Sequence, residues 1–412
     1  MPILGTVASF GLLPEAPTIG TATAGDTSAT VTYTAPTWAG KTSGSVTYTA
    51  TSNPSGLTGT GSSPITVSGL SNGTSYTFTV AATTSYGVTG PSSAASNSII
   101  PAVQGQPDRA LFIGGGTFYT GASALQTVDY VAVSTTGNAT SFGNLTTARL
   151  NAMASGSSTR ATYGGGFISG GQTASIEYFT IATTGNGTSF GSLTASKGWF
   201  SDGLSNDIYG MYYGGGNNGT LPETNQMEYI TTATLGNSAS FGNLTRSVFG
   251  VSAAAGNTTR GIIAGGAYNS GNNYTDIIQY FTYGTSGSTA TFGNVSLQIN
   301  DLNGFSSSTR MVFGGGFGVN GVQRSQIEYI TIATTGNSTS FGNQTVGRSS
   351  SGSTSNKTRG LFAGGADSAT WDPKNSIEYV TIATTGNGTS FGNMTSSREF
   401  LGATSGSHGG IA

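Results

Sequence analysis

The sequence predicts an all-β protein in which a small N-terminal β-sandwich is followed by a six-bladed β-propeller. Three observations support this fold class. A unit of about 50 residues occurs six times from Arg109 onward, each unit holds four short strand-like segments bounded by Gly, Asn or Ser, and no helical period of 3.6 residues appears in the 412 residues.

The composition fits short strands joined by many turns. Charged residues make up 7% of the chain, the formal net charge is -2, and Gly occurs 67 times. Aromatic and β-branched residues recur throughout, which argues against low-complexity disorder. Because the net charge is small and no stretch is apolar over the width of a bilayer, we expect no nucleic-acid partner and no membrane insertion.

Two aromatic residues mark the repeat. The first marker is a Tyr that ends a short run, as in the Glu177-Tyr178 pair, and the second is a Phe that opens a later Phe-Gly pair. Each marker recurs from one unit to the next in steps of 48 to 51 residues. The Tyr series is Tyr130, Tyr178, Tyr229, Tyr280, Tyr329 and Tyr379, and the Phe series is Phe142, Phe190, Phe241, Phe292, Phe341 and Phe391.

Each unit predicts a four-stranded antiparallel meander. In the second copy the segments are a small polar stretch at 151–158, an apolar run at 162–166 that ends in glycines, an alternating stretch at 176–183, and a short segment around Phe190. A repeat of this length with four strands is typical of a propeller blade. Because the first segment is rich in Gly, Ser and Ala, we expect it to lie innermost, along a central channel.

The unit resembles the kelch repeat. The resemblance rests on the apolar run into Gly-Gly, the variable loop, the alternating strand with an aromatic, and the second aromatic about a dozen residues later. Phe stands at the usual Trp position, and Gln298 interrupts the basic residues that open the next first strand in that family. The counterparts of those basic residues are Arg149, Lys197, Arg246, Arg348 and Arg398.

The two ends of residues 109–412 predict closure of this kelch-like propeller. The first copy begins directly with its Gly-Gly strand at Arg109, and the chain ends in a first strand, 398–404, that no further unit follows. We therefore expect the C-terminal strand to complete the first blade, which protects strand edges that an open ring would expose.

Residues 17–101 resemble a fibronectin type III β-sandwich. The run from Leu70 to Tyr76 is similar to that family's corner, in which a Tyr hydroxyl binds backbone upstream, and Tyr33 occupies the usual Trp place. Residues 102–108 are expected to be a linker, and residues 1–16 an N-terminal docking segment.

Regular charges in so neutral a chain suggest structural ion pairs between the repeats, because an unpaired buried charge costs several kcal/mol, about 3–5 in typical cases. We expect each Arg that leads a Gly-Gly strand to pair with the acid one blade later. In the third copy Gly210 replaces the Arg, and in the fourth Gln279 replaces the acid. The predicted pairs involve Arg109, Arg160, Arg260, Arg310 and Arg359 with Asp129, Glu177, Glu228, Glu328 and Glu378.

The residues that most catalytic sites need are scarce. The chain has no Cys, and its one His, His408, lies in a tail that we expect to fray, so a zinc or copper site and a serine triad are excluded. Acids outside the repeat lie on different loops: Asp202, Asp207, Glu223, Asp301, Asp367 and Asp372. Loop polarity explains them, and a calcium site near Asp367 and Asp372 is the alternative. We expect no enzymatic activity, no cofactor and no metal.

Comparison of the six copies distinguishes two faces. Loops between first and second strands and between third and fourth strands hardly change, and Asn-x-Thr/Ser triplets such as that at Asn186 recur there, where Asn more simply turns the backbone than carries a glycan. Loops after Gly-Gly differ freely and carry aromatics suited to sugars or a protein partner, although such aromatics could merely cover blade edges. These candidate ligand-binding residues are Tyr119, Tyr268, Tyr274 and Trp371.

The run from Thr180 to Asn186, echoed from Thr331 and Thr381, resembles repeats in structural proteins of tailed phages, notably those of marine cyanobacteria. The resemblance implies a virion protein, either an exposed tail or capsid adhesin that binds a host surface glycan or receptor, or a purely architectural component. A glycan-active enzyme is a third hypothesis. We expect the N-terminal region to bind other virion proteins.

Overall fold

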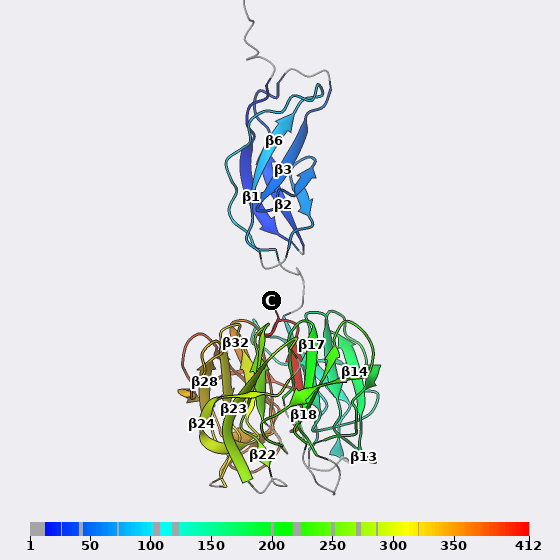
Figure 1. The fold of residues 1–412 in the computed structure, drawn as a ribbon, viewed down its shortest axis with the longest axis vertical. Coiled ribbons are helices and arrows are strands. Elements are labelled where there is room, and N and C mark those ends of the chain that lie inside the picture. Colours follow the sequence, from blue (N-terminus) through cyan, green and yellow to red (C-terminus); the bar gives the residue numbers. More distant parts are fainter. Residues whose placement is uncertain are drawn as a thin grey trace, which may run out of the picture. The chain divides into compact units, whose positions relative to one another are not determined.

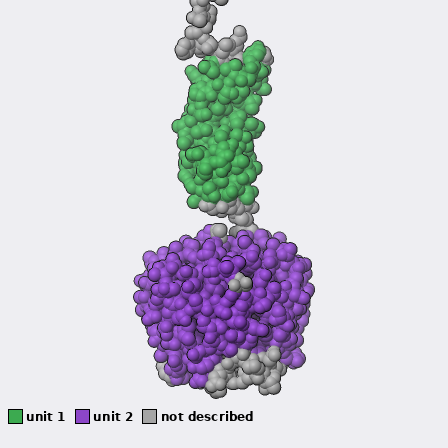
Figure 2. Space-filling model, viewed as in Figure 1, with its two compact units in different colours: residues 1–105 green, residues 106–412 purple. Residues whose placement is uncertain are grey.

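The computed structural model describes residues 13–25, 27–40, 44–71, 74–101, 108–117, 123–198, 202–216, 224–248, 252–268, 273–285, 287–319 and 321–411. The chain divides into two compact units, residues 1–105 and 106–412 (Figure 2). The described residues form strands and turns without an α-helix, so the predicted all-β class is confirmed. No helix in this part of the chain could therefore span a membrane. Most of the predicted docking segment and of the linker lies outside the described residues.

The first unit is a sandwich of two three-stranded antiparallel sheets (Figure 1). Buried and half-buried side chains alternate along β6 (Thr77–Thr83), in which Phe78, Val80 and Ala82 are buried, and the buried faces of both sheets meet in one hydrophobic core. One sheet has the order β1 (Thr18–Ala24), β2 (Ser28–Thr34), β5 (Ile65–Ser68), and the other β4 (Thr58–Thr60), β3 (Thr47–Asn53), β6 (Thr77–Thr83).

The corner expected at Tyr76 is present. The Tyr76 side chain is buried, and its hydroxyl accepts a hydrogen bond from the backbone N–H of Ser71 at 3.1 Å. Backbone bonds in both directions between Tyr76 and Ile99 attach the final segment of the unit beside β6. Tyr33 lies at the edge of the core, 4.7 Å from the ring of Tyr48.

The described part of residues 106–412 contains six antiparallel sheets that are each built on four strands in meander order, and two further sheets of two short strands (Figure 1). Written from first to fourth strand, the first three sheets are β36 (Gly402–Ser405), β7 (Arg109–Ile113), β8 (Thr127–Ala132), β9 (Thr140–Asn144); β10 (Met153–Gly156), β11 (Arg160–Gly164), β14 (Ser175–Thr180), β15 (Thr188–Ser192); and β16 (Leu204–Ser205), β17 (Tyr209–Tyr213), β18 (Gln226–Thr231), β19 (Ala239–Asn243). The other three are β20 (Ala253–Gly256), β21 (Arg260–Ala264), β23 (Asn273–Thr282), β24 (Ala290–Asn300); β25 (Asn303–Ser306), β26 (Arg310–Gly314), β28 (Gln326–Thr331), β29 (Thr339–Asn343); and β31 (Gly352–Ser355), β32 (Arg359–Ala363), β34 (Ser376–Thr381), β35 (Thr389–Asn393).

Shorter strands lie in the loops that follow the Gly-Gly strands and, for β30, in the link that leads into β31. They are β12 (Phe167–Ile168) with β13 (Gly171–Gln172), β22 (Ala267–Tyr268) on β23, β27 (Phe317–Gly318) on β24, and β30 (Arg348–Ser349) with β33 (Ala366–Asp367).

The first strands are completely buried and made largely of small residues, as in the Gly-Ser-Thr-Ser run of β31. Each contacts the next along the chain, and β36 contacts both β31 and β10. β36 also pairs with β7, from Gly402 opposite Ile113 to Ser405 opposite Ala110. The C-terminal strand therefore completes the first sheet, as the sequence predicts.

Neighbouring sheets are joined by backbone hydrogen bonds at their fourth strands. Gly185 N–H donates to Phe142 C=O at 2.9 Å, and the same bond from Gly137 to Phe391 joins the sixth sheet to the first. A Cβ atom on Gly143 would lie 2.1 Å from the Gly185 carbonyl oxygen, which explains the Gly of the repeated Phe-Gly pair.

The repeated Asn residues have a role at the same junctions. Asn186 Oδ1 accepts the N–H of Asn144 at 3.0 Å, and Asn138 Oδ1 accepts that of Asn393 at 3.0 Å. The Asn side chain therefore caps the fourth strand of the neighbouring sheet.

The predicted partners of the Arg residues that lead the Gly-Gly strands are wrong. Arg160 lies 4.9 Å from the ring centre of Tyr178 in its own sheet and donates to the carbonyls of Thr232 and Ala233 in the next sheet. The reason is strand parity. Arg160 is opposite Thr180, whose side chain shares a face with Tyr178, whereas Glu177 points to the other face. The same stacking joins Arg109 to Tyr130, Arg260 to Tyr280, Arg310 to Tyr329 and Arg359 to Tyr379.

The acids pair instead with bases in the link that leads from the previous sheet. These described ion pairs are Arg149 with Glu177, Lys197 with Glu228, Arg348 with Glu378 at 3.4 Å, and Arg398 with Asp129 at 2.9 Å. Glu328 accepts from Ser296 and Ser338 and lies 3.7 Å from Arg324.

Two assignments within the repeat also change. Tyr209, not Gly210, stands in the place of the leading Arg and lies edge-on to Tyr229 at 5.5 Å. Val248, not Arg246, stands in the place of Arg149, because Gly215 N–H donates to Val248 C=O as Gly115 N–H does to Arg149 C=O. At this junction Val248 stands at the position of the base and Gln279 at the position of the acid, so both positions are uncharged.

Candidate ligand-binding site

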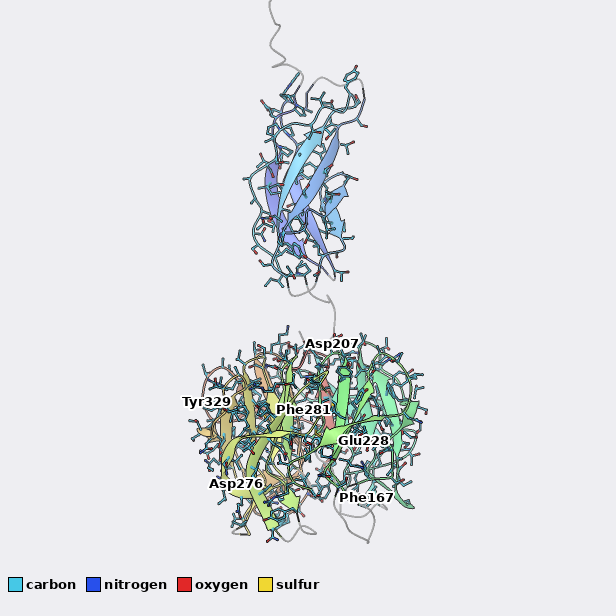
Figure 3. The ribbon with its side chains drawn as sticks, viewed as in Figure 1. Phe167, Asp207, Glu228, Asp276, Phe281 and Tyr329 are labelled. Carbon is cyan, nitrogen blue, oxygen red and sulfur yellow. The ribbon has the colours of Figure 1, made fainter. Side chains whose placement is uncertain are left out.

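The variable loops lie together at one end of the second unit. Figure 3 shows Phe167, in the loop after Gly166, at the end opposite Asp207, which lies in a loop between first and second strands. β13 and β22 also lie at the Phe167 end (Figure 1). The candidate site is a pocket of about 340 Å³ built from these loops and from the links that lead into first strands. It is lined by Tyr274, Asn300, Asp301, Phe317, Ser349, Ser350, Ala366, Trp371, Glu399 and Phe400.

Three aromatic rings form a row along the pocket. Phe317 lies between the other two, with its ring centre 6.2 Å from that of Tyr274 and 5.6 Å from that of Trp371. The rings come from β23, from β27, which pairs with β24, and from the loop after β33. Trp371 is 56% exposed, so the row is open to a ligand. Rows of accessible aromatic rings bind flat apolar surfaces such as those of sugar rings.

A rigid turn holds Trp371 in place. Asp367 Oδ1 accepts from the backbone of Ala369 and Thr370 at 3.1 and 2.8 Å, and Lys374 lies 3.0 Å from the other carboxylate oxygen. Hydrogen bonds, first of all from the Thr370 backbone, lower the pKa of Asp367 to about 2. Trp371 has a φ of 60°, a left-handed conformation that is rare for a bulky residue.

The calcium site considered for this turn is therefore not needed to explain Asp367, whose carboxylate already binds Lys374 and the turn. Among the residues that the structure describes, no group of three or more His, Asp or Glu side chains could hold a metal ion.

Two carboxyl groups share the pocket with the aromatic row. Asp301 lies in the link to β25 with a φ of 56°, and Glu399 lies in the link to β36. Burial raises the pKa of Asp301 to about 7, and burial together with the charge of Asp301 raises that of Glu399 to about 7. Asp301, one of the acids that lie on different loops, is brought beside Glu399 because links from different sheets meet at this pocket.

The candidate residues named from the sequence are only partly brought together. Tyr274 and Trp371 line the pocket, whereas Tyr268 is covered by the guanidinium of Arg246, 4.3 Å from its ring centre. Tyr119 lies outside the described residues.

Sequence reasoning missed Phe317, Glu399 and Phe400. One signal could have found Glu399. Glu399 and Gly116 exchange two backbone hydrogen bonds, and the fully buried Leu150 exchanges the same two bonds with Phe167 in the next sheet. Glu399 therefore places a carboxyl group at a position of the repeat that is apolar in the next copy.

His408 and Asp202 belong to the buried centre of the unit and not to this pocket. His408 Nδ1 accepts from Gly410 N–H at 3.1 Å and Nε2 lies 3.1 Å from Gly156 O and Ser205 Oγ, so the expected frayed tail is in fact ordered around this side chain. Burial lowers the pKa of His408. Asp202 accepts from Gly304 N–H and Ser353 Oγ, and burial raises its pKa well above the usual range. Both side chains are engaged in structural hydrogen bonds.

Comparison with known proteins concerns the first unit. No curated protein matches the chain. Residues 15–98 match the family model of the fibronectin type III domain, in agreement with the two-sheet sandwich and the Tyr76 corner. Residues 15–98 are therefore a fibronectin type III domain.

Proposed function

We propose that residues 106–412 form a closed, six-bladed, kelch-like propeller. The proposal is supported by the repeated backbone bonds between fourth strands, which include the bond from Gly137 to Phe391, and by the pairing of β36 with β7. The C-terminal strand β36 covers the edge of β7 that would otherwise be unpaired.

Disulfide trapping tests closure, and the absence of native Cys makes it clean. Cysteines at Asn138 and Asn393 span the junction of sheets six and one, and cysteines at Asn186 and Asn144 span the equivalent junction of sheets one and two. A closed ring predicts equal cross-linking of the two pairs within one chain. Cross-linking of the second pair alone would mean an open ring.

We propose further that the protein is a non-enzymatic structural component of a tailed-phage virion, exposed on tail or capsid, that binds a host surface glycan. The observation that carries the binding role is the open row of Tyr274, Phe317 and Trp371 on the variable face. The likeness of the Thr180 to Asn186 run to phage structural repeats supports the virion assignment. The N-terminal region would bind other virion proteins.

A glycan array tests the binding role. Trp371→Ala should abolish the signal of the native chain, because it removes the most exposed ring of the row. Trp38→Ala is the matched control, since Trp38 is 47% exposed in the other unit. If the native chain binds no glycan, or if both variants lose binding equally, the proposed site is wrong.

Particle assembly tests the virion role. Deletion of residues 1–13 should prevent incorporation into particles while glycan binding is retained. Unchanged incorporation would refute the docking role of the N-terminal region, incorporation without any glycan binding would leave the architectural role alone, and sugar release from host envelope would establish an enzyme.

A further inference from the structure

The pocket combines an aromatic row with two carboxyl groups and lacks a basic lining residue. All of the Lys and Arg residues of 106–412 lie in the described part of the chain, and none of them is an ion-pair partner of Asp301 or Glu399 there. Lys374, a cation in one of the loops on this face, is paired with Asp367 at 3.0 Å. The charge of the two carboxylates is therefore not balanced within the protein.

This charge distribution decides which sugars the pocket favours. Sugars that carry carboxylate or sulfate groups would bring a third negative charge beside Asp301 and Glu399. A protonated amine would instead balance the pair, and aromatic faces add a further attraction for cations.

We propose that the pocket binds a saccharide that carries a protonated amine, with the ammonium group between Asp301 and Glu399 and a sugar ring against Trp371 and Tyr274. This inference rests on the proposed glycan-binding function. A volume of about 340 Å³ falls at the lower end of the usual range for ligand pockets and suits one or two sugar rings.

Binding should release protons near neutral pH. In the free protein the pKa of each carboxyl is about 7, so a proton is held by part of the population at that pH. An ammonium group favours the charged carboxylates and lowers both pKa values, so the affinity rises from about pH 5 upward for as long as the amine of the ligand keeps its own proton. The other titratable group in the pocket, Tyr274, has a pKa raised by burial and by Asp301, and hydrogen bonds hold the pKa of the neighbouring Asp367 at about 2, so the Asp367 carboxylate stays charged in this range.

Calorimetric titration of the full chain with a fully deacetylated glucosamine tetramer and its N-acetylated counterpart tests the proposal. We expect the amine form to bind at least about tenfold more tightly at pH 6, where the glucosamine amines are protonated, which is the size expected for one charge-assisted hydrogen bond, with a heat that depends on the ionisation enthalpy of the buffer. Asp301→Asn with Glu399→Gln should abolish this preference and the proton release while binding of the acetylated form is kept. Asp372→Asn, an exposed acid on the Trp371 loop, is the matched control and should preserve both.

The outcomes separate this inference from the function on which it rests. Equal or tighter binding of the acetylated tetramer, or a preference that persists in the Asp301 and Glu399 double variant, would overturn the inference alone. Failure to bind either tetramer or any array glycan would overturn the glycan-binding function as well. Stronger binding of a lysine-rich peptide than of the amine saccharide would assign the pocket to a protein partner.

Discussion

The buried pair of Arg149 and Glu177 allows a quantitative test of how neighbouring sheets are held together. The two side chains are 1% and 3% exposed, and Arg149 also donates to Ser175 C=O at 2.9 Å. Arg149→Val leaves the Glu177 carboxylate buried and without its cation, although the carboxylate still accepts a hydrogen bond from the Thr146 N–H at 2.8 Å. Removal of one partner of a buried pair costs about 3–5 kcal/mol, so we expect a loss of that size.

The chain already contains a neutral version of this junction. Val248 stands in the place of Arg149, and Gln279 accepts the Thr245 N–H at 3.0 Å as Glu177 accepts that of Thr146. Replacing a buried ion pair by a packed neutral pair is often close to neutral. Arg149→Val combined with Glu177→Gln should therefore recover most of the loss.

Scanning calorimetry of the full chain is the appropriate assay. The transition of residues 106–412 should fall by about 5 to 10 °C in Arg149→Val and by a much smaller amount in the double variant. The transition of the fibronectin type III domain serves as an internal control. A double variant that melts as early as the single one, or a single variant that melts like the native protein, would refute the assignment of these residues as one compensating pair.

Three other contacts give predictions for single variants. A Cβ atom on Gly143 would lie 2.1 Å from the carbonyl oxygen of Gly185, whereas a Cβ atom on Gly185 would meet no atom within 4 Å. Gly143→Ala should therefore lower the melting temperature and Gly185→Ala should not. Equal melting temperatures of the two variants would contradict the contact. Tyr76→Phe removes the acceptor of the Ser71 N–H bond and should cost the first unit about 1 kcal/mol in urea denaturation, with the second unit unaffected. The native Asp301 carboxyl keeps its proton up to a pKa of about 7, whereas the carboxyl of the unfolded chain loses its proton near the usual value of 3.8. Asp301→Asn should therefore stabilise the protein increasingly from about pH 4 to about pH 7 and by a constant amount above that pH; a pH-independent difference in melting temperature would argue against this burial.

Much of the fold could be predicted from the sequence because it is repeated. The Tyr and Phe markers give the length of the unit, and the first copy at Arg109 without a first strand predicts the pairing of β36 with β7. The fibronectin type III domain could be predicted because its corner is a local motif, Leu70 to Tyr76, that needs no distant contact.

The ion-pair partners could not be predicted from spacing alone, although strand parity would have corrected them. Glu177 and Tyr178 are neighbours and point to opposite faces, so a base that meets one cannot meet the other. The pocket was still harder to predict from the sequence, because Asp301 and Glu399 are almost 100 residues apart in the sequence and meet only where links from different sheets converge.

Departures from the repeat are of two kinds, and the distinction indicates where function resides. Val248 departs from the basic position, but Gln279 departs with it, so the junction remains satisfied and the change concerns packing. Glu399 stands at the position that the buried, apolar Leu150 occupies in the next copy, and no base in the described part of the chain compensates for its charge. Asp301, beside Glu399, also has no cation as a partner in that part of the chain. A carboxyl pair that selection for stability alone would remove is best explained by a ligand that supplies the missing charge. The uncompensated departures thus point to the same pocket as the exposed ring of Trp371.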